Sequence, residues 1–218
     1  MIDRHERRIV LWRHGRTAWN AERRFQGQTD IALDDEGVAQ AQRAASLLVH
    51  LTPSRIVSSD LSRAFATAQA LAALTDLEVV ADPRLRETFA GEWEGLRRPE
   101  LLATYGDELA NWASDSYARP GGGETRVEVA ERMVAAIEAY VNELPARGTL
   151  VVATHGGSAR AAIGALLELP PQNWGCLGVL SNCAWSILTE NTTGHGPGWR
   201  LQEYNAGSLP TPALADDR

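Results

Sequence analysis

Two histidines in this sequence each follow a short apolar run that has the character of a buried strand. His14 follows residues 9–12, and His155 follows residues 149–154. Such runs are typical of strands in a parallel sheet, and the carboxyl ends of these strands meet at one ligand-binding edge. We therefore expect the two imidazoles, together with the guanidinium of Arg13, to lie close to one another.

An arginine and a glutamate reach the same edge by a similar route. Arg63 falls in the first turn of a helix that follows an expected strand at 55–58, and Glu87 follows a strand that ends near Ala81. Either histidine alone would more commonly be a buried structural residue, but polar residues that converge in this way indicate a ligand site. A phosphoryl group requires this combination: arginines for its oxygens, a nitrogen nucleophile, and a carboxylic acid for the leaving oxygen.

The charge around the first histidine predicts its protonation state. Arginines close to His14 would disfavour the protonated imidazole by like-charge repulsion. We therefore expect a neutral ring whose lone pair is available for attack at neutral pH.

The elements around these residues alternate between strands and helices. We expect strands at 9–12, 55–58, 77–81, 149–154, 184–188 and 199–204, and helices at 33–51, 61–74, 125–144 and 158–169. Ser59 or Asp60 is expected to cap the second of these helices. The alternation predicts an α/β fold, a three-layer sandwich in which helices cover both faces of a mostly parallel sheet. We expect a single domain over residues 1–218, with a loose tail from 205 to 218.

Residues from about 89 to 124 depart from this pattern. They mix aromatic residues with short helical pieces and end in a run of glycines at 121–123. We interpret the segment as a small helical lid inserted into the main fold, with the glycines as a flexible connection and a phosphate-cradling loop as the alternative. Trp93, Trp112 and Trp174 are candidates to stack on a sugar ring, although tryptophans are more commonly core residues.

The composition excludes several classes of protein. The chain has 218 residues, of which 44% are hydrophobic and 22% charged, as in soluble globular proteins. Its net charge of −7 argues against nucleic acid or an anionic membrane surface as a partner. All 21 basic residues are arginines, which excludes a catalytic lysine and a Walker-type phosphate loop. The longest uncharged stretch, 169–189, is interrupted by prolines and glycines, so we expect no membrane span.

The remaining motifs argue against other hydrolase types and against export. Cys176 and Cys183 are too few for a disulfide framework, and the amino terminus has no signal-peptide pattern, so we expect a cytoplasmic protein. A zinc hydrolase built on His14, His155 and Glu87 is an alternative, but the sequence has no close-spaced ligand pair such as His-x-x-x-His. A Ser-His hydrolase would require a Gly-x-Ser-x-Gly turn, which is missing from the sequence.

Taken together, these motifs resemble the histidine phosphatase superfamily, which has the phosphoglycerate-mutase-like fold. The resemblance covers nearly the whole chain and rests on the segments LWRHGRTAWN at 11–20, FQGQTD at 25–30, SSDLSRA at 58–64, LRE at 85–87, GEWEGL at 91–96, and HG at 155–156. It implies that His14 accepts the phosphoryl group to form a phosphohistidine, and that Glu87 is the general acid. Arg13, Arg63 and His155 are implied to form the phosphate cradle.

The resemblance also implies secondary contacts to the phosphate. These are Thr17, Asn20, Gln26 and the backbone N–H of Gly156. Neither a metal nor an organic cofactor is expected. A binding-only sensor on this fold would normally lack His14 or Glu87, and both are present.

Within the family, the sequence favours hydrolysis over transfer. Mutases carry a longer insertion between the acid and the second histidine, with a basic pair that holds the substrate carboxylate. Here that interval is short, and its one adjacent arginine pair, Arg97-Arg98, is not in the expected place. Stretches such as 56–64, 122–127 and 182–185 resemble the glucosyl-3-phosphoglycerate phosphatases, whose members are dimeric. We expect a homodimer acting on that compound or a related sugar or glycerate phosphate, with a mutase-type transferase or a broad-specificity phosphatase as alternatives.

Overall fold

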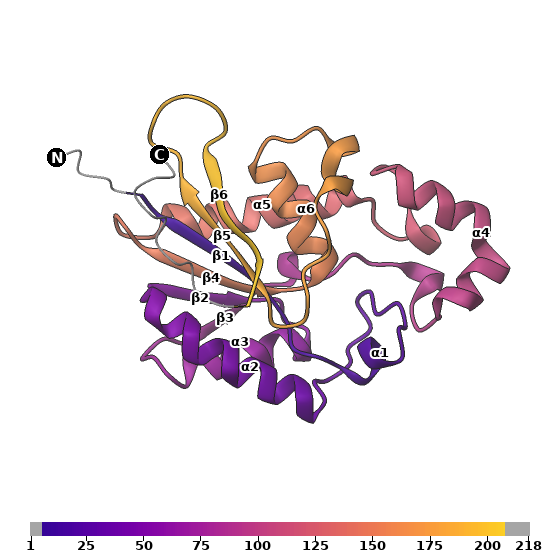
Figure 1. Cartoon of the computed structure of the whole chain (residues 1–218), viewed down its shortest axis with the longest axis horizontal. Coiled ribbons are helices and arrows are strands. Elements are labelled where there is room, and N and C mark those ends of the chain that lie inside the picture. The colour runs from indigo at the N-terminus through magenta and orange to yellow at the C-terminus, as the bar shows by residue number, and fades with distance from the viewer. Residues whose placement is uncertain (1–5, 208–218) are drawn as a thin grey trace, which may run out of the picture.

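A six-stranded sheet lies between two layers of helices in the computed structural model, which describes residues 6–207 (Figure 1). The strands are β1 (Arg8–Arg13), β2 (Arg55–Ser58), β3 (Val79–Ala81), β4 (Thr149–Thr154), β5 (Trp185–Glu190) and β6 (Trp199–Ala206), arranged in the order β3-β2-β4-β1-β5-β6. The first four pair in parallel, whereas β5 is antiparallel to β1 and β6 is antiparallel to β5. The predicted three-layer, mostly parallel α/β fold is confirmed.

Helices cover both faces of this sheet. They are α2 (Asp35–Leu48), α3 (Ser62–Ala72), α5 (Arg126–Asn142) and α6 (Gly156–Leu166). Ile9 and Leu11 of β1 belong to the hydrophobic cluster on the α5 and α6 side, whereas Val10 and Trp12 belong to the cluster on the α2 and α3 side. In Figure 1, α5 and α6 lie above the sheet, and α2 and α3 lie below it. Because both faces of β1 are buried, its sequence is continuously apolar rather than alternating.

Two of these helices begin with side-chain caps that the sequence supplies locally. The Asp34 carboxylate accepts the backbone N–H of Gly37 at 2.8 Å at the start of α2. At the start of α5, the Thr125 hydroxyl and the Glu128 carboxylate accept each other's backbone N–H groups, which is a capping box. These caps define where α5 begins, and α5 carries several of the polar residues described below.

The cap predicted for α3 is wrong. Its N-cap residue is Leu61, which makes no side-chain capping bond. Asp30, from a distant loop, instead accepts the backbone N–H of Ser62 at 2.8 Å. The Ser59 hydroxyl accepts the backbone N–H of Leu61 at 3.3 Å, one residue before the helix begins. The Asp60 carboxylate makes an ion pair that is described below.

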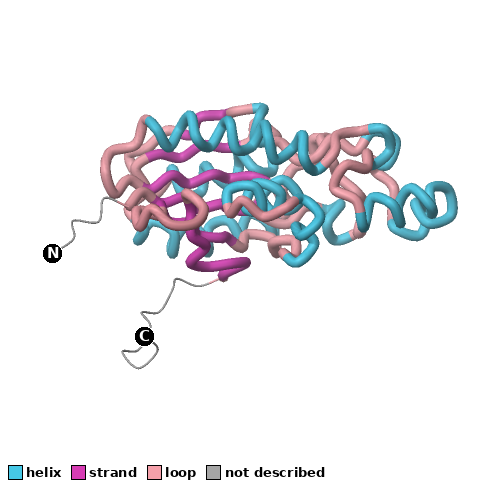
Figure 2. The backbone as a smooth tube through the Cα atoms, turned by 90° about the horizontal axis from the view of Figure 1, so that it is seen from above, coloured by secondary structure: helices cyan, strands magenta, loops and turns pink. Residues whose placement is uncertain are grey.

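Residues 89–124 form a separate group of elements at one end of the molecule. They contain α4 (Arg98–Ser114) and the short 3-10 helices η3 (Gly91–Trp93) and η4 (Pro120–Gly122), and both Figures 1 and 2 place α4 beyond the right-hand end of the sheet. A small hydrophobic cluster that includes the fully buried Trp93 lies within the segment. A Cβ atom on Gly121 would lie 2.4 Å from the carbonyl oxygen of Ala90, and one on Gly123 would lie 1.9 Å from that of Phe89. The glycines therefore allow the two ends of the segment to pack backbone against backbone, rather than serving as a loose connection.

The remaining elements correct the predicted boundaries. Three short pieces were not predicted: α1 (Ala18–Ala21), η2 (Pro83–Leu85) and η5 (Pro171–Cys176). The last three residues of the helix predicted at 33–51 form the 3-10 helix η1 (Val49–Leu51). The predicted loose tail is wrong at its start, because β6 continues to Ala206, and residues 208–218 lie outside the described part of the chain. No helix within residues 6–207 is long and apolar enough to cross a membrane.

Candidate active site

The two histidines lie at the carboxyl ends of adjacent strands. β1 and β4 pair in parallel with Arg13 opposite Thr154, so the next residue of each chain segment is a histidine. The ring centroids of His14 and His155 are 5.2 Å apart. His14 is 2% exposed and His155 is fully buried. The sequence rule that places strand ends at one edge of the sheet therefore located both rings.

A backbone carbonyl group sets the tautomer of His14. Its Nδ1 lies 2.7 Å from the carbonyl oxygen of Gly15. Because a carbonyl oxygen only accepts, Nδ1 carries the proton and Nε2 keeps its lone pair. Burial, reinforced by the charges of Arg13 and Arg63, holds the pKa of His14 well below its usual range. The neutral ring predicted from the arginines is present, although burial is the larger cause.

His155 is held from both sides of its ring. The Nε of Arg63 donates to its Nδ1 at 3.2 Å, so Nε2 carries the proton and donates to the hydroxyl oxygen of Ser59 at 2.9 Å. Burial, followed by the charge of Arg63, holds the pKa of His155 well below its usual range.

The two predicted phosphate-binding arginines are held by carbonyl groups rather than by carboxylates. Arg63 is fully buried and donates to the carbonyl oxygens of Thr29 at 2.9 Å and Gly27 at 2.8 Å. Burial lowers the pKa of Arg63 to about 10, so it remains charged at neutral pH. Arg13 donates to the carbonyl oxygen of Leu180, and its buried Nε has no partner within residues 6–207. Both guanidinium groups are therefore available to an incoming anion.

Glu87 lies against the amino terminus of α6. Its carboxylate accepts the backbone N–H groups of Gly157 and Ser158, both at 2.9 Å, and that of Thr88 at 2.8 Å. The approach requires a glycine, because a Cβ atom on Gly157 would lie 2.7 Å from a carboxylate oxygen of Glu87. Backbone N–H groups at a helix start attract anions, so they hold this carboxylate at the edge of the site.

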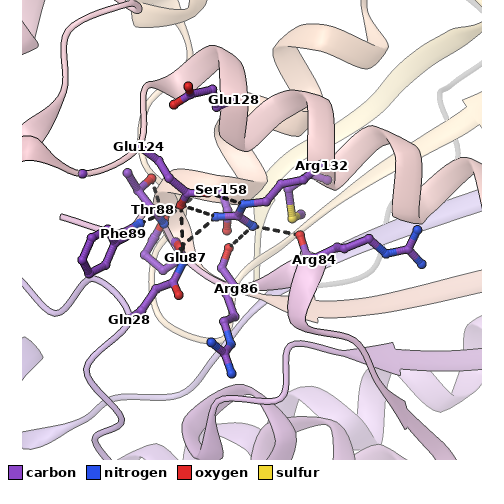
Figure 3. A network of polar contacts seen from close by, with 12 residues as sticks. Gln28, Arg84, Arg86, Glu87, Thr88, Phe89, Glu124, Glu128, Arg132 and Ser158 are labelled. Atoms are coloured by element: carbon purple, nitrogen blue, oxygen red, sulfur yellow. Dashed lines mark hydrogen bonds and ion pairs between the residues drawn. The ribbon is translucent and has the colours of Figure 1, made fainter. Parts of the chain in front are cut away.

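The backbone around Glu87 is held by a second group of contacts, shown in Figure 3. Arg132, on α5, donates to the carbonyl oxygens of Arg84, Arg86 and Glu87 at 2.8, 2.7 and 2.9 Å. It also donates to both carboxylate oxygens of Glu124, at 2.8 and 2.9 Å. These contacts involve all five N–H groups of the guanidinium.

A further ion pair joins this loop to the start of α3. The guanidinium of Arg86 donates to both carboxylate oxygens of Asp60, at 2.7 and 2.6 Å. Asp60 is therefore occupied by Arg86 instead of capping α3. The loop that carries Glu87 is held by α5 on one side and by the loop before Arg63 on the other.

Two side-chain amides face the site with their oxygens already bound. The Thr17 hydroxyl caps α1, where it accepts the backbone N–H of Asn20 at 3.1 Å, and it lies 3.0 Å from the Oε1 of Gln26. The Oδ1 of Asn20 accepts from the amide of Asn182 at 3.1 Å. With both amide oxygens held by the protein, the NH₂ groups of Asn20 and Gln26 are the donors left for a ligand.

A cavity of about 230 Å³ opens in front of these groups. Most of the predicted site residues form its walls, namely Arg13, His14, Asn20, Gln26, Arg63 and Glu87. Thr17, His155 and Gly156 lie behind the walls, next to residues that form them. The structure thus brings the nine residues into one region, in two layers.

Three arginines in the cavity wall were not predicted: Arg24, Arg126 and Arg160. Arg24 forms an ion pair with Glu22 at 2.6 Å. Arg160 lies one helical turn after Gly157 on α6, a spacing that signals a shared helix face. Arg126 is the first residue of α5, and its guanidinium lies 4.2 Å over the ring of Trp112. No comparable signal in the sequence marks Arg126, because its position depends on how α5 and α4 pack. Of the three candidate tryptophans, Trp112 lines the cavity, whereas Trp93 and Trp174 belong to hydrophobic clusters.

Arg126 and Arg160 carry positive charge without a carboxylate partner. Neither Arg126 nor Arg160 forms an ion pair with a residue in the range 6–207, and the Nε of Arg126 is buried without a partner there. Burial, followed by the charge of Arg160, lowers the pKa of Arg126 to about 10. The cavity therefore has a second region of unpaired positive charge besides Arg13 and Arg63.

The residue types at the site do not suit a metal. No group of three or more His, Cys, Asp or Glu side chains in the described part of the chain is arranged to hold a metal ion. Arg13 and Arg63 beside the histidines would also repel a cation. The arrangement instead suits an anion.

Comparison with known proteins agrees with this geometry. The family model for the histidine phosphatase superfamily (branch 1) matches residues 9–207. The glucosyl-3-phosphoglycerate phosphatase of Mycolicibacterium vanbaalenii is 40% identical over 215 residues, which is 93% of this chain and 96% of that protein. The 2,3-bisphosphoglycerate-dependent phosphoglycerate mutase 2 of Gloeobacter violaceus is 36% identical over 170 residues, covering 75% of this chain and 77% of that protein.

A solved structure shows the same similarity in three dimensions. A mycobacterial glucosyl-3-phosphoglycerate phosphatase complexed with VO3 superposes with a TM-score of 0.84 and is 41% identical. The match covers 92% of this chain and 99% of that one.

Proposed function

Because the chain belongs to branch 1 of the histidine phosphatase superfamily, we propose that it hydrolyses a phosphomonoester through a phosphohistidine on His14. The substrate that we propose is glucosyl-3-phosphoglycerate or a related sugar or glycerate phosphate. The observation that carries this proposal is a neutral, buried imidazole with an unprotonated Nε2, at the wall of a cavity rich in unpaired arginines.

In the first step, the Nε2 of His14 attacks phosphorus as the bond to the ester oxygen breaks. Arg13 and Arg63 neutralise the equatorial oxygens, and the NH₂ groups of Asn20 and Gln26 donate to them. The ring gains positive charge as the N–P bond forms, and the Nδ1 hydrogen bond to the Gly15 carbonyl stabilises that charge. Glu87 gives its proton to the leaving oxygen.

In the second step, a water molecule hydrolyses the phosphohistidine. Glu87, now ionised, takes a proton from the water as its oxygen attacks phosphorus and the N–P bond breaks. Phosphate leaves and His14 returns to its neutral state. Acid–base assistance of this kind contributes about 10²–10⁴ in rate.

The charge of the cavity supports a substrate with a second anionic group. Arg13 and Arg63 suffice for the phosphate, and Arg126 and Arg160 then remain without a partner among the described residues. Arg160 lies about 5 Å, one helical turn, beyond Gly157 along α6. Both arginines line the same cavity as His14, so we propose that the carboxylate of a three-carbon acid contacts them while its phosphate is bound near His14.

The size of the cavity supports a position for the sugar at its mouth. A volume of about 230 Å³ is below the roughly 300–1,000 Å³ of sites that enclose a drug-sized ligand. We therefore place the phosphate and the acid inside and the glucosyl group beside Trp112 and Val179, of which Val179 is 51% exposed.

The wider properties of the enzyme are also proposals. We propose that the chain forms one domain over residues 1–218, that residues 89–124 act as a lid, and that the enzyme is a cytoplasmic homodimer without a metal or organic cofactor. The small hydrophobic cluster of residues 89–124, against which Phe25 packs from outside the segment, supports the lid, since a segment with buried residues of its own is able to move as a unit. Light scattering of the purified protein measures the oligomeric state.

A substrate panel tests the proposed function. Phosphate release is measured with glucosyl-3-phosphoglycerate, 3-phosphoglycerate, sugar phosphates and an aryl phosphate, while isomerised phosphoglycerate is followed in parallel. We expect the highest kcat/KM for the glucosylated acid and no release by His14→Ala. Uniformly slow hydrolysis would indicate a broad-specificity phosphatase, and isomerisation without phosphate release would indicate a mutase.

A further inference from the structure

We infer that Arg132 and Glu124 are positioning residues that determine where the carboxyl group of Glu87 stands relative to the leaving oxygen. The inference rests on the proposed acid role of Glu87 and adds residues that do not line the cavity. We call Arg132 and Glu124 the clamp.

The clamp is hydrogen-bonded to the loop that carries Glu87. All five N–H groups of Arg132 are used, three of them on the carbonyl oxygens of Arg84, Arg86 and Glu87. Each carbonyl group occupies a fixed place in a planar fork, so these backbone positions cannot move independently of α5. Because three of its hydrogen bonds go to backbone carbonyl groups, Arg132 constrains the conformation of the loop.

Glu124 holds the backbone on the other side of Glu87. Its Oε2 accepts the backbone N–H of Phe89 at 2.8 Å and the side-chain amide of Gln28 at 3.3 Å. That amide also donates to the carbonyl oxygen of Glu87 at 3.0 Å. The backbone is therefore gripped at Glu87 and on both sides of it, as Figure 3 shows.

The clamp holds the backbone at Glu87 but not its carboxylate. That carboxylate accepts the N–H groups of Gly157 and Ser158 on α6 and of Thr88 in the loop, and none of the clamp bonds involves it. The carboxyl group is thus able to leave α6 for the leaving oxygen while the loop stays in place. Such a division is what an acid needs if it is to transfer a proton twice in each cycle.

The clamp is an ion pair whose two side chains are partly buried. The side chains of Arg132 and Glu124 are 19% and 24% exposed. Burial is the largest single effect and opposes the charge of Glu124. The hydrogen bonds from Arg132 and from the backbone N–H of Phe89, together with the charge of Arg132, outweigh it and leave the pKa of Glu124 below its usual value. Partly buried ion pairs are weak contributors to stability, which points to a role in positioning.

The test compares Arg132→Met and Glu124→Gln with the wild type on phosphate esters whose leaving groups rise in pKa from nitrophenols to alkyl alcohols. A misplaced acid matters most when the leaving oxygen needs a proton. We expect kcat/KM, which reports the transfer to His14 and not the later hydrolysis of the phosphohistidine, to fall about tenfold or more for alkyl esters, part of the full acid contribution. It should change less than about twofold for nitrophenyl phosphate. The Brønsted plot of log (kcat/KM) against leaving-group pKa should therefore become steeper.

Arg119→Met is the matched control. Arg119 pairs with Glu128 near the start of α5, and its hydrogen bonds go to Gly123 and Glu128 rather than to the loop at 84–89. The Arg119→Met substitution removes an arginine and an ion pair from the same region. The Brønsted slope of this variant should equal that of the wild type. Melting temperatures of all variants separate loss of fold from loss of position, and Glu124→Gln, which keeps the size of the side chain, serves if Arg132→Met does not fold.

Glu87→Gln distinguishes the two ways of failing. If Glu87→Gln slows every ester equally, the proposed acid role fails. If Glu87→Gln steepens the plot but neither clamp variant does, or if the clamp variants slow all esters equally, the clamp inference is overturned and the proposed function stands.

Discussion

Arg160→Gln removes one of the two cavity arginines proposed to bind the carboxylate, without breaking a hydrogen bond or ion pair to a described residue. Arg160 has a like-charge interaction with Arg126. Removing it relieves repulsion, so the melting temperature of the variant should not fall. The substitution therefore isolates a contact that exists only when substrate is bound.

The size of the effect follows from the partner that Arg160 would meet. A hydrogen bond to a charged group contributes about 1.5–3 kcal/mol. Because the Arg160 side chain is only partly buried, we take the lower end, about 1.5 kcal/mol, which corresponds to about a tenfold loss in kcat/KM. Aryl phosphates have no carboxylate, so their kcat/KM should be unchanged.

The assay is the ratio of kcat/KM for glucosyl-3-phosphoglycerate to that for an aryl phosphate. Arg43→Gln is the control, because Arg43 pairs with Glu36 outside the cavity and the net charge changes equally. An equal loss on both substrates, or no loss on the acid-bearing ester, would refute the second anion contact.

Three further predictions concern the histidines and a glycine. His14→Ala should abolish turnover and the acid-labile phosphoprotein trapped by rapid quenching, because no other group takes the phosphoryl; a persistent adduct would contradict the assignment. The free energy of unfolding, measured with urea, should fall as the pH drops from 7 to 5. Unfolded histidines bind protons near pH 6.5, whereas folded His14 and His155 bind them only well below it, so protons favour the unfolded state. A flat profile would speak against burial as the cause. Gly15→Ala should destabilise by about 2–3 kcal/mol, since its Cβ would lie 2.3 Å from the Gly37 carbonyl oxygen, whereas Gly106→Ala, with open space around it, should not.

The fold followed from the pattern of apolar runs because each run is a local property. Residues 55–58 and 149–154 were predicted as strands and form β2 and β4 with the same bounds. Parallel strands must then present their carboxyl ends at one edge. His14 and His155 lie one residue beyond such ends, so their proximity could be predicted from position alone.

Contacts between distant elements were beyond the reach of that reasoning. The N–H of the first residue of α3 is bound by Asp30. Ser59 contacts His155 and the N–H of Leu61, and Asp60 pairs with Arg86. Reasoning from local sequence assigns a residue that is able to cap to the nearest helix. It does so because the local sequence does not show which distant groups compete for that side chain. The predicted cap was therefore wrong even though the helix itself was correct.

The sequence by itself determined the order of strands and helices, the strand-end residues and the family motifs, because hydrophobic periodicity and short motifs are read along one stretch of chain. Only the tertiary structure decided that Arg126 and Arg160 line the cavity without an ion pair to a described residue, and that Arg132 holds the loop of Glu87. All 21 arginines have the same side-chain chemistry. What distinguishes them is which carboxylates and carbonyl groups the packing of α4, α5 and α6 brings within hydrogen-bond distance, and short-range bonds of this kind depend on positions in space rather than on spacing in sequence.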